Sequence, residues 1–324
     1  MCRGILGLSN EGIEFDETLV IGGELTVRRL GYGAMRLTGR GIWGEPRAPD
    51  EARAVLGRAV QLGVNFIDTA DSYGPGVSER LIAEALRPYP AELVIATKGG
   101  YRRPAPGRWQ PAGRPEHLRE ACEGSLRRLG LDRIDLYHLH TVDPHVPFED
   151  SVGALAELQQ EGKIAHVGLS NVSGAQVEQA RRIVRVETVQ NRYNLVDRGS
   201  GDVLRLCERE GIAFICWFPV DRGLLGRSGR LGHIARAHGT SATRIALAWL
   251  LHRSPVTVPI PGTTSTAHLE ENMAALRVRL TVEELDALDR YRTTLRDRLR
   301  RNARRALSRA AVTLAGRERR SPAG

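Results

Sequence analysis

Four side chains capable of acid–base chemistry follow three successive apolar segments of the sequence. Asp68 and Tyr73 come at and after the end of the first segment, Lys98 at the end of the second, and His140 at the end of the third. Each has an ordinary structural explanation, as a helix cap, an ion-pair partner or a satisfied polar residue. Their joint occurrence at consecutive segment ends favours a catalytic site instead.

These residue types suit the protonation of an oxygen atom. A tyrosine has a pKa near ~10, which is too high for easy proton exchange at neutral pH. A nearby ammonium group lowers that pKa, and an aspartate holds the ammonium in place. A histidine across the pocket can hydrogen-bond a carbonyl oxygen. Only two of the 47 basic residues are lysines, Lys98 and Lys163, so position 98 is notable as a compact charge that arginine would spread.

The elements that must position these residues alternate regularly. A hairpin comes first, over Thr18–Ile21 and Leu25–Val27 around Gly22-Gly23. Eight strand candidates follow, at 29–33, 65–68, 93–97, 134–139, 165–170, 188–190, 213–217 and 257–260. Helical periodicity lies between and after them, at 51–62, 78–87, 116–129, 149–161, 174–184, 202–210, 241–252 and 267–276. Eight βα units predict an α/β fold, a (β/α)8 TIM barrel, whose active site lies at the carboxyl ends of the strands.

Composition and charge narrow the class of protein. With 41% hydrophobic and 26% charged residues among 324, we expect a globular domain over residues 1–290. The region 291–324 is an arginine-rich extension, helical or disordered, and it carries the net positive charge. We expect a solvated appendage or a helix packed on the barrel; binding of that extension to nucleic acid or an anionic membrane stays open. No membrane span, secretory signal, disulfide framework or metal site is expected, which indicates a cytoplasmic protein.

The site has no convincing covalent nucleophile and no metal-ligand spacing. A site that protonates an oxygen without its own electron source calls for a redox cofactor. The stretch Gly31-Tyr32-Gly33 is not a Rossmann fingerprint, because a loop and not a helix is expected to follow it.

Several motifs resemble those of the aldo-keto reductases. They include NFIDTADSYG at 65–74, IATK at 95–98, DLYHLH at 135–140, GLSN at 168–171, QNRYN at 190–194 and IPGTT at 260–264. The resemblance extends from about Leu25 to Arg290. It implies a (β/α)8 barrel that binds NADP(H), with NAD(H) possible, and transfers hydride to an aldehyde or ketone. By the same resemblance Tyr73 is the general acid, Lys98 and Asp68 tune it, and His140 orients the carbonyl.

The resemblance also implies cofactor contacts. Ser170, Asn171 and Gln190 would hold the nicotinamide carboxamide, and Trp217 would stack on the ring, although a core tryptophan is the competing interpretation. The remaining expected cofactor-binding residues are Gly33, Ala34, Met35, Asp68, Phe218, Pro219, Ile260, Gly262, Thr263, Ser265, His268, Glu271 and Asn272.

Three positions depart from the family pattern. Phe218 replaces a common serine, Gly262 replaces a common lysine, and His268 stands where an arginine often meets the 2′-phosphate. Each change removes charge or a hydrogen-bond donor from the expected phosphate site, which weakens the expected preference for NADPH over NADH.

Substrate choice depends on the loops. Trp43, in the loop after the first strand, and Trp109, in the loop over Tyr101–Arg114, are candidates for an aromatic substrate pocket, with surface covering as the alternative. The sequence predicts a small-molecule carbonyl substrate, does not fix its identity, and leaves an oligomer possible. A second hypothesis is a cofactor-sensing regulatory or binding subunit of the same fold with little turnover.

Overall fold

A computed structural model describes residues 12–221 and 229–291. Eight strands form one parallel sheet in the order β12-β11-β10-β9-β8-β5-β4-β3. The strands are β3 (Tyr32–Gly33), β4 (Phe66–Asp68), β5 (Val94–Gly99), β8 (Ile134–Leu139), β9 (Ile164–Ser170), β10 (Val186–Arg192), β11 (Ala213–Trp217) and β12 (Thr257–Pro259). The two end strands are joined by backbone hydrogen bonds from Gly31 N to Pro259 O (3.0 Å) and from Gly33 N to Pro261 O (3.5 Å). The curled sheet therefore closes into the predicted barrel.

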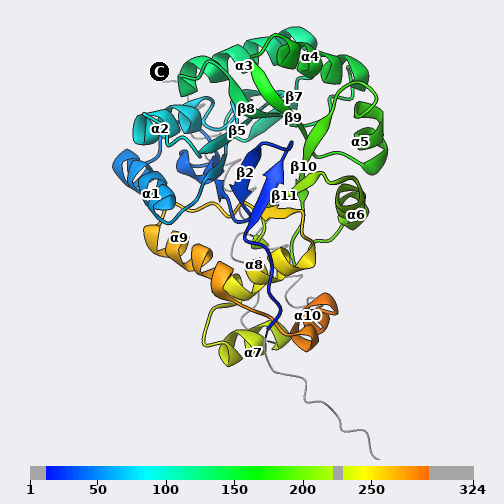
Figure 1. The fold of residues 1–324 in the computed structure, drawn as a ribbon. Coiled ribbons are helices and arrows are strands. Elements are labelled where there is room, and N and C mark those ends of the chain that lie inside the picture. The colour runs from blue at the N-terminus through cyan, green and yellow to red at the C-terminus, as the bar shows by residue number, and fades with distance from the viewer. Residues whose placement is uncertain (1–11, 222–228, 292–324) are drawn as a thin grey trace, which may run out of the picture.

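Helices surround the sheet as an outer layer (Figure 1). They are α1 (Pro49–Gln61), α2 (Val77–Leu86), α3 (Pro115–Leu129), α4 (Phe148–Gln160), α5 (Gly174–Ala180), α6 (Gly201–Glu210), α8 (Ala242–Arg253) and α9 (Thr266–Met273). Their starts follow local chemistry, with proline in the first turn of α1 and α3 and a capping box of Ser173 and Gln176 at α5. Each predicted βα unit is present, with ends shifted by a few residues.

Several elements were not expected from the sequence. They are α7 (Gly229–Ala237), α10 (Val282–Asp289) and the short 3-10 helix η1 (Ala34–Leu37). The helix predicted at 267–276 is α9 followed directly by the 3-10 helix η3 (Ala274–Arg277). The segment Tyr101–Arg114 is not simply a loop, because it contains the antiparallel pair β6 (Tyr101–Ala105) and β7 (Arg108–Pro111). Its prolines and exposed arginines obscure the alternating pattern that predicts a hairpin.

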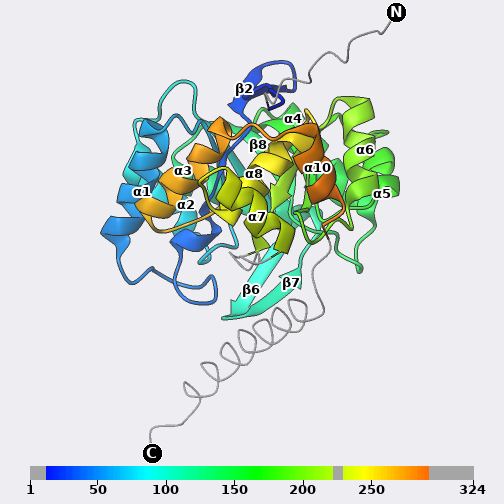
Figure 2. The same cartoon turned by 90° about the horizontal axis from the view of Figure 1, so that it is seen from below.

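Two hairpins mark the two ends of the barrel. The predicted hairpin β1 (Thr18–Ile21) and β2 (Leu25–Arg28) lies at one end, and β6–β7 lies at the other (Figure 2). Ile21 and Val27 of the first hairpin pack with Phe66, Leu136 and other residues inside the barrel. The first hairpin thus closes the amino-terminal end with apolar side chains and leaves the carboxyl end for a site.

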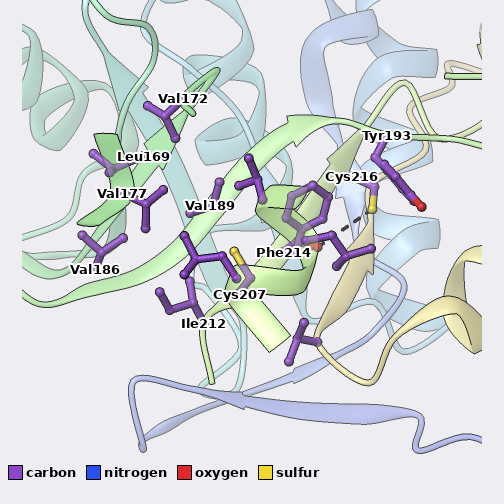
Figure 3. Close-up of a cluster of buried hydrophobic side chains, with 14 of the residues drawn as sticks. Leu169, Val172, Val177, Val186, Val189, Tyr193, Cys207, Ile212, Phe214 and Cys216 are labelled. Carbon is purple, nitrogen blue, oxygen red and sulfur yellow. Dashed lines mark hydrogen bonds between the residues drawn. The ribbon is translucent and has the colours of Figure 1, made fainter. Parts of the chain in front are cut away.

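The main core lies between the strands and the outer helices. Figure 3 shows part of it, where Val189 and Phe214 of the sheet pack with Val177 of α5 and Cys207 of α6. Cys122, Cys207 and Cys216 are buried free thiols. Within the described ranges, none of the helices combines the length and apolar character that crossing a bilayer requires. The expected extension 291–324 lies outside the described residues except for Tyr291.

Arg29, just before β3, connects the start of the barrel to the end of α8 and the start of β12. It is 1% exposed and donates hydrogen bonds to Leu251 O (2.6 Å), Ser254 O (2.6 Å) and Thr257 O (3.2 Å). Burial lowers the pKa of Arg29 to about 10, so its guanidinium stays charged at neutral pH.

We predict that Arg29→Met lowers the free energy of unfolding by about 3 kcal/mol, because it leaves several buried carbonyl groups without donors. Urea denaturation measures this change. Arg53→Met is the matched control; Arg53 makes only exposed ion pairs with Asp50 and Glu84, and its removal should cost less than about 1 kcal/mol. Equal losses in the two variants would contradict the role of Arg29.

Candidate active site

The four predicted acid–base residues converge at the carboxyl end of the barrel. Lys98 Nζ lies 2.7 Å from Asp68 Oδ1 and donates to Thr69 O at 2.6 Å and to Tyr73 OH at 3.4 Å. Strands β4 and β5 are neighbours, with Asp68 paired to Ala96, which brings the acid and the lysine side by side. The sequence separates them by 30 residues, so only the sheet places them in contact.

A tight loop presents Tyr73 to this ion pair. Tyr73 N donates to Ala70 O, and Gly76, with φ of +75°, leads into α2. Gly74 has φ of +88°, and a side chain there would collide with Val77. These two glycines, which follow Tyr73, therefore allow the turn that directs Tyr73 inward.

Burial sets the protonation of Tyr73. Burial raises the pKa of Tyr73, and the partial lowering of that pKa by Lys98 does not overcome it. Lys98 lowers the pKa of Tyr73 as expected, but burial outweighs this effect and the charge of Asp68 adds to the rise, so the net direction is upward. For Lys98 itself burial opposes ionisation, but the attraction of Asp68 wins and the pKa is raised. The arrangement is a neutral phenol next to a charged ammonium.

His140 faces Tyr73 across the site. Their ring centroids are 5.7 Å apart, and the planes are inclined at 81°. Burial, followed by the positive charge of Lys98, holds the pKa of His140 well below its usual value. Ser72 Oγ lies 3.3 Å from Nδ1 of His140. The neutral ring keeps one N–H group, and a proton on Nε2 leaves Nδ1 to accept from Ser72.

A cavity of about 1330 Å³ opens from these residues towards α9. Gln190 Nε2 donates to Asp68 Oδ2 (2.7 Å), and Asn171 Nδ2 donates to His140 O and Ser170 Oγ, each at 3.0 Å. Most predicted cofactor-binding residues line this cavity: Gly33, Met35, Asp68, Ser170, Asn171, Gln190, Trp217, Phe218, Pro219, Ile260, Gly262, Thr263, His268, Glu271 and Asn272.

Two predicted cofactor residues and one predicted pocket residue do not line the cavity. Ala34 is fully buried, and Ser265 caps α9 by accepting from His268 N. Trp43 is bridged to Gly74 through the backbone and its ring lies 5.6 Å from Arg103 Cζ, so it packs on that side chain and does not line the cavity. Trp109 does line the cavity, together with Tyr101, which the sequence did not single out.

The sequence also missed two arginines that line the cavity. Arg36 of η1 and Arg236 of α7 also line the cavity, and neither forms an ion pair with a described residue. Arg36 follows Met35 directly, so its neighbourhood could have been a signal. Arg236 lies in a helix that no sequence pattern linked to the site. A side chain at Gly262 would collide with the Gly33 carbonyl and meet Arg36 Cγ at 3.6 Å, so Arg36 runs beside position 262.

Comparison with known proteins agrees with this geometry. The profile described as the aldo/keto reductase family matches residues 29–292. An uncharacterised oxidoreductase of Schizosaccharomyces pombe is 48% identical over 268 residues, which cover 82% of this chain and 87% of the relative. Pyridoxine 4-dehydrogenase of Escherichia coli is 45% identical over 273 residues, covering 82% and 96% respectively. A crystal structure of an aldo-keto reductase from Klebsiella pneumoniae in complex with NADPH has a TM-score of 0.73 and 28% identity, covering 85% of this chain and 94% of that one.

Asp71, in the loop before Tyr73, has a buried carboxyl oxygen with no hydrogen-bond partner in the described structure. Burial, and next the charge of Glu79, raise the pKa of Asp71 to about 8. The folded protein therefore holds a proton that the unfolded chain, with an ordinary carboxyl pKa, releases. Asp71 therefore makes folding less favourable as the pH rises from about 4 to about 8.

We predict that Asp71→Asn raises the melting temperature by about 2–5 °C at pH 8 and has little effect at pH 4. Thermal unfolding followed by circular dichroism at both pH values measures the difference. Asp50→Asn, at an exposed position, is the control and should show no such growth with pH. A stabilisation independent of pH would contradict the raised pKa of Asp71.

Proposed function

The chain belongs to the aldo/keto reductase family, and from that premise we propose that Tyr73 is the proton donor of an NADP(H)-dependent carbonyl reductase. Reduction of an aldehyde or ketone to an alcohol, with NADPH as the preferred cofactor, is the reaction that the family and the NADPH complex of a structural neighbour support. The observation that carries the residue assignment is the contact of a buried phenol with a buried Lys98–Asp68 ion pair.

The cavity fits a dinucleotide cofactor. A volume of about 1330 Å³ exceeds the roughly 300–1,000 Å³ of ordinary ligand pockets, which leaves room for a cofactor and a substrate together. When bound, the cofactor supplies the hydride for the carbonyl carbon. Ser170, Asn171 and Gln190 would hold the nicotinamide amide, and Trp217, whose Nε1 is buried without a partner among the described residues, would lie against the ring.

Tyr73 is arranged to give its proton to the substrate. Lys98 Nζ donates to the phenolic oxygen, so the hydrogen of the phenol is free to point elsewhere, towards the cavity. The raised pKa keeps that hydrogen in place until negative charge builds up on the substrate oxygen. The resulting phenolate lies beside the ammonium of Lys98, which stabilises it until a proton returns from solvent.

His140 orients the carbonyl group. Its neutral imidazole can donate one N–H to the same oxygen that Tyr73 protonates. Asn171 holds the backbone carbonyl of His140, and Ser72 lies against its Nδ1, so both the ring and its main chain are fixed. Two donors thus converge on one oxygen.

The wall next to these donors is aromatic. Tyr101, Trp109 and Tyr73 surround His140 with interplanar angles of 74–81° between the paired rings. Such a wall favours a carbonyl compound with a flat substituent. The E. coli relative named pyridoxine 4-dehydrogenase is consistent with a flat heteroaromatic substrate. The site does not favour the alternative of a regulatory subunit, because all four acid–base residues lie together in an arrangement suited to catalysis.

We predict that Tyr73→Phe lowers kcat with NADPH and 4-nitrobenzaldehyde by at least about 100-fold, because it removes the proton donor. NADPH oxidation followed by absorbance measures this loss. Fluorescence titration with NADPH should give an unchanged Kd, which shows that the variant is folded and loaded. Unchanged turnover in Tyr73→Phe would overturn the assignment of the proton donor.

We predict that Arg36 and Arg236 supply the phosphate preference that Gly262 and His268 do not. Arg36→Ala and Arg236→Ala should each weaken NADPH binding about 10-fold or more, since each removes a charge-assisted donor. The Kd values for NADPH and NADH, measured by fluorescence titration, separate the two phosphate contributions: a residue at the 2′-phosphate changes only NADPH affinity. Arg53→Ala is the control. Unaltered affinity for both cofactors would exclude these arginines from the binding site.

A further inference from the structure

Arg103 is a buried cation at the substrate end of the barrel. It lies on β6 and is 8% exposed. Its guanidinium donates to three backbone carbonyl groups, at Ser72 (2.9 Å), Arg108 (3.1 Å) and Gly41 (3.3 Å). These carbonyls belong to the loop that carries Tyr73, the start of β7, and the loop after the first strand. One side chain therefore ties together three segments that are remote in sequence.

The same guanidinium packs against two tryptophans. Its Cζ atom lies 3.7 Å from the ring centroid of Trp109 and 5.6 Å from that of Trp43. Arginine is suited to this role because its planar group can stack on a ring while its edge still donates hydrogen bonds. Trp43 is in turn joined by a backbone bridge to Gly74, the residue that follows Tyr73.

Arg103 has no acidic partner to explain its burial. Among residues 12–221 and 229–291, no carboxylate lies within ion-pairing distance of it. Burial lowers the pKa of Arg103 to about 10, which still leaves it charged at neutral pH. The preceding residue, Arg102, is exposed on the same strand. A buried charge without a counter-charge is unfavourable, so a position that keeps one is a candidate for a specific task.

The tryptophan on which Arg103 stacks, Trp109, lies beside the proposed proton donor. The ring centroid of Trp109 lies 6.4 Å from that of Tyr73 and 6.2 Å from that of His140. Ser72, whose carbonyl Arg103 binds, precedes Tyr73 and places its hydroxyl 3.3 Å from His140 Nδ1. Both sides of the space that would receive the carbonyl group thus depend on one guanidinium.

We propose that Arg103 is a positioning and specificity-determining residue: it fixes the indole of Trp109 against the Tyr73–His140 pair, and so selects carbonyl compounds with a flat aromatic substituent. This inference rests on the proposed function, because it takes Tyr73 and His140 as the groups that bind the substrate oxygen. Arg103 does not itself touch the reacting atoms; it acts through Trp109 and through the Tyr73 loop.

The test compares two aldehydes, 4-nitrobenzaldehyde as the flat substrate and propanal as the compact one, each with NADPH. Arg103→Met should raise the KM for 4-nitrobenzaldehyde about 10-fold more than the KM for propanal. Arg103→Lys, which keeps the charge but lacks the planar face, should recover only part of this selectivity. It also serves as the second variant if Arg103→Met does not fold. Arg102→Met is the matched control on the neighbouring position and should behave as the wild type.

A double-mutant cycle with Trp109→Ala separates positioning from general damage. If Arg103 acts through Trp109, then Arg103→Met should have little further effect on the KM ratio once Trp109 is gone. Equal effects of Arg103→Met in the presence and absence of Trp109 would overturn the proposal, as would an unchanged KM ratio in both Arg103 variants. Loss of the proposed function has a different signature, since turnover would then be independent of Tyr73 in the wild-type background.

Discussion

The buried ion pair of Lys98 and Asp68 is the constraint on which the active site depends. Each charge is almost completely removed from water, and neither would be stable there alone. The pair is retained because its remaining hydrogen-bonding groups also find partners: Thr69 O accepts from Lys98, and Gln190 donates to Asp68. Gln190 lies on β10, so the pair is held from both sides of the barrel interior. Loss of either charge would leave the other buried and unpaired.

The barrel is arranged to meet this requirement. The parallel pairing of β4 with β5 sets the acid beside the lysine, and the closing hydrogen bonds between β3 and the chain after β12 bring Gly33 next to Gly262. At the opposite end, the β1–β2 hairpin fills the barrel with apolar side chains. The apolar hairpin therefore covers the barrel interior below the ion pair, and the cavity lies on the other side of that pair.

The cavity has two chemically different ends. Near Tyr73 it is bordered by aromatic rings held by Arg103, and this end suits the flat part of a carbonyl substrate. Beside Gly262 it is bordered by Arg36, and Arg236 and the hydroxyl groups of Thr263 and Thr264 also line it; these groups suit phosphate. At positions 262 and 268 the chain lacks the basic side chains that many family members have. Arg36 and Arg236, which lie on other elements, bring positive charge to the cavity instead.

The sequence by itself determined the order of the elements and the chemical identity of the site. The periodicity of strands and helices is a local property, so eight βα units and the residues at their carboxyl ends, Asp68, Lys98 and His140, could be predicted. The β6–β7 hairpin was missed because its prolines and arginines obscure the alternation. Only the tertiary structure decided the contacts between remote segments. These include the placement of Arg36, Arg236 and Arg103, and the position of Trp43 outside the cavity lining. It also decided the direction of the Tyr73 pKa, because that direction depends on how far burial outweighs a neighbouring charge, and burial is a property of the folded chain.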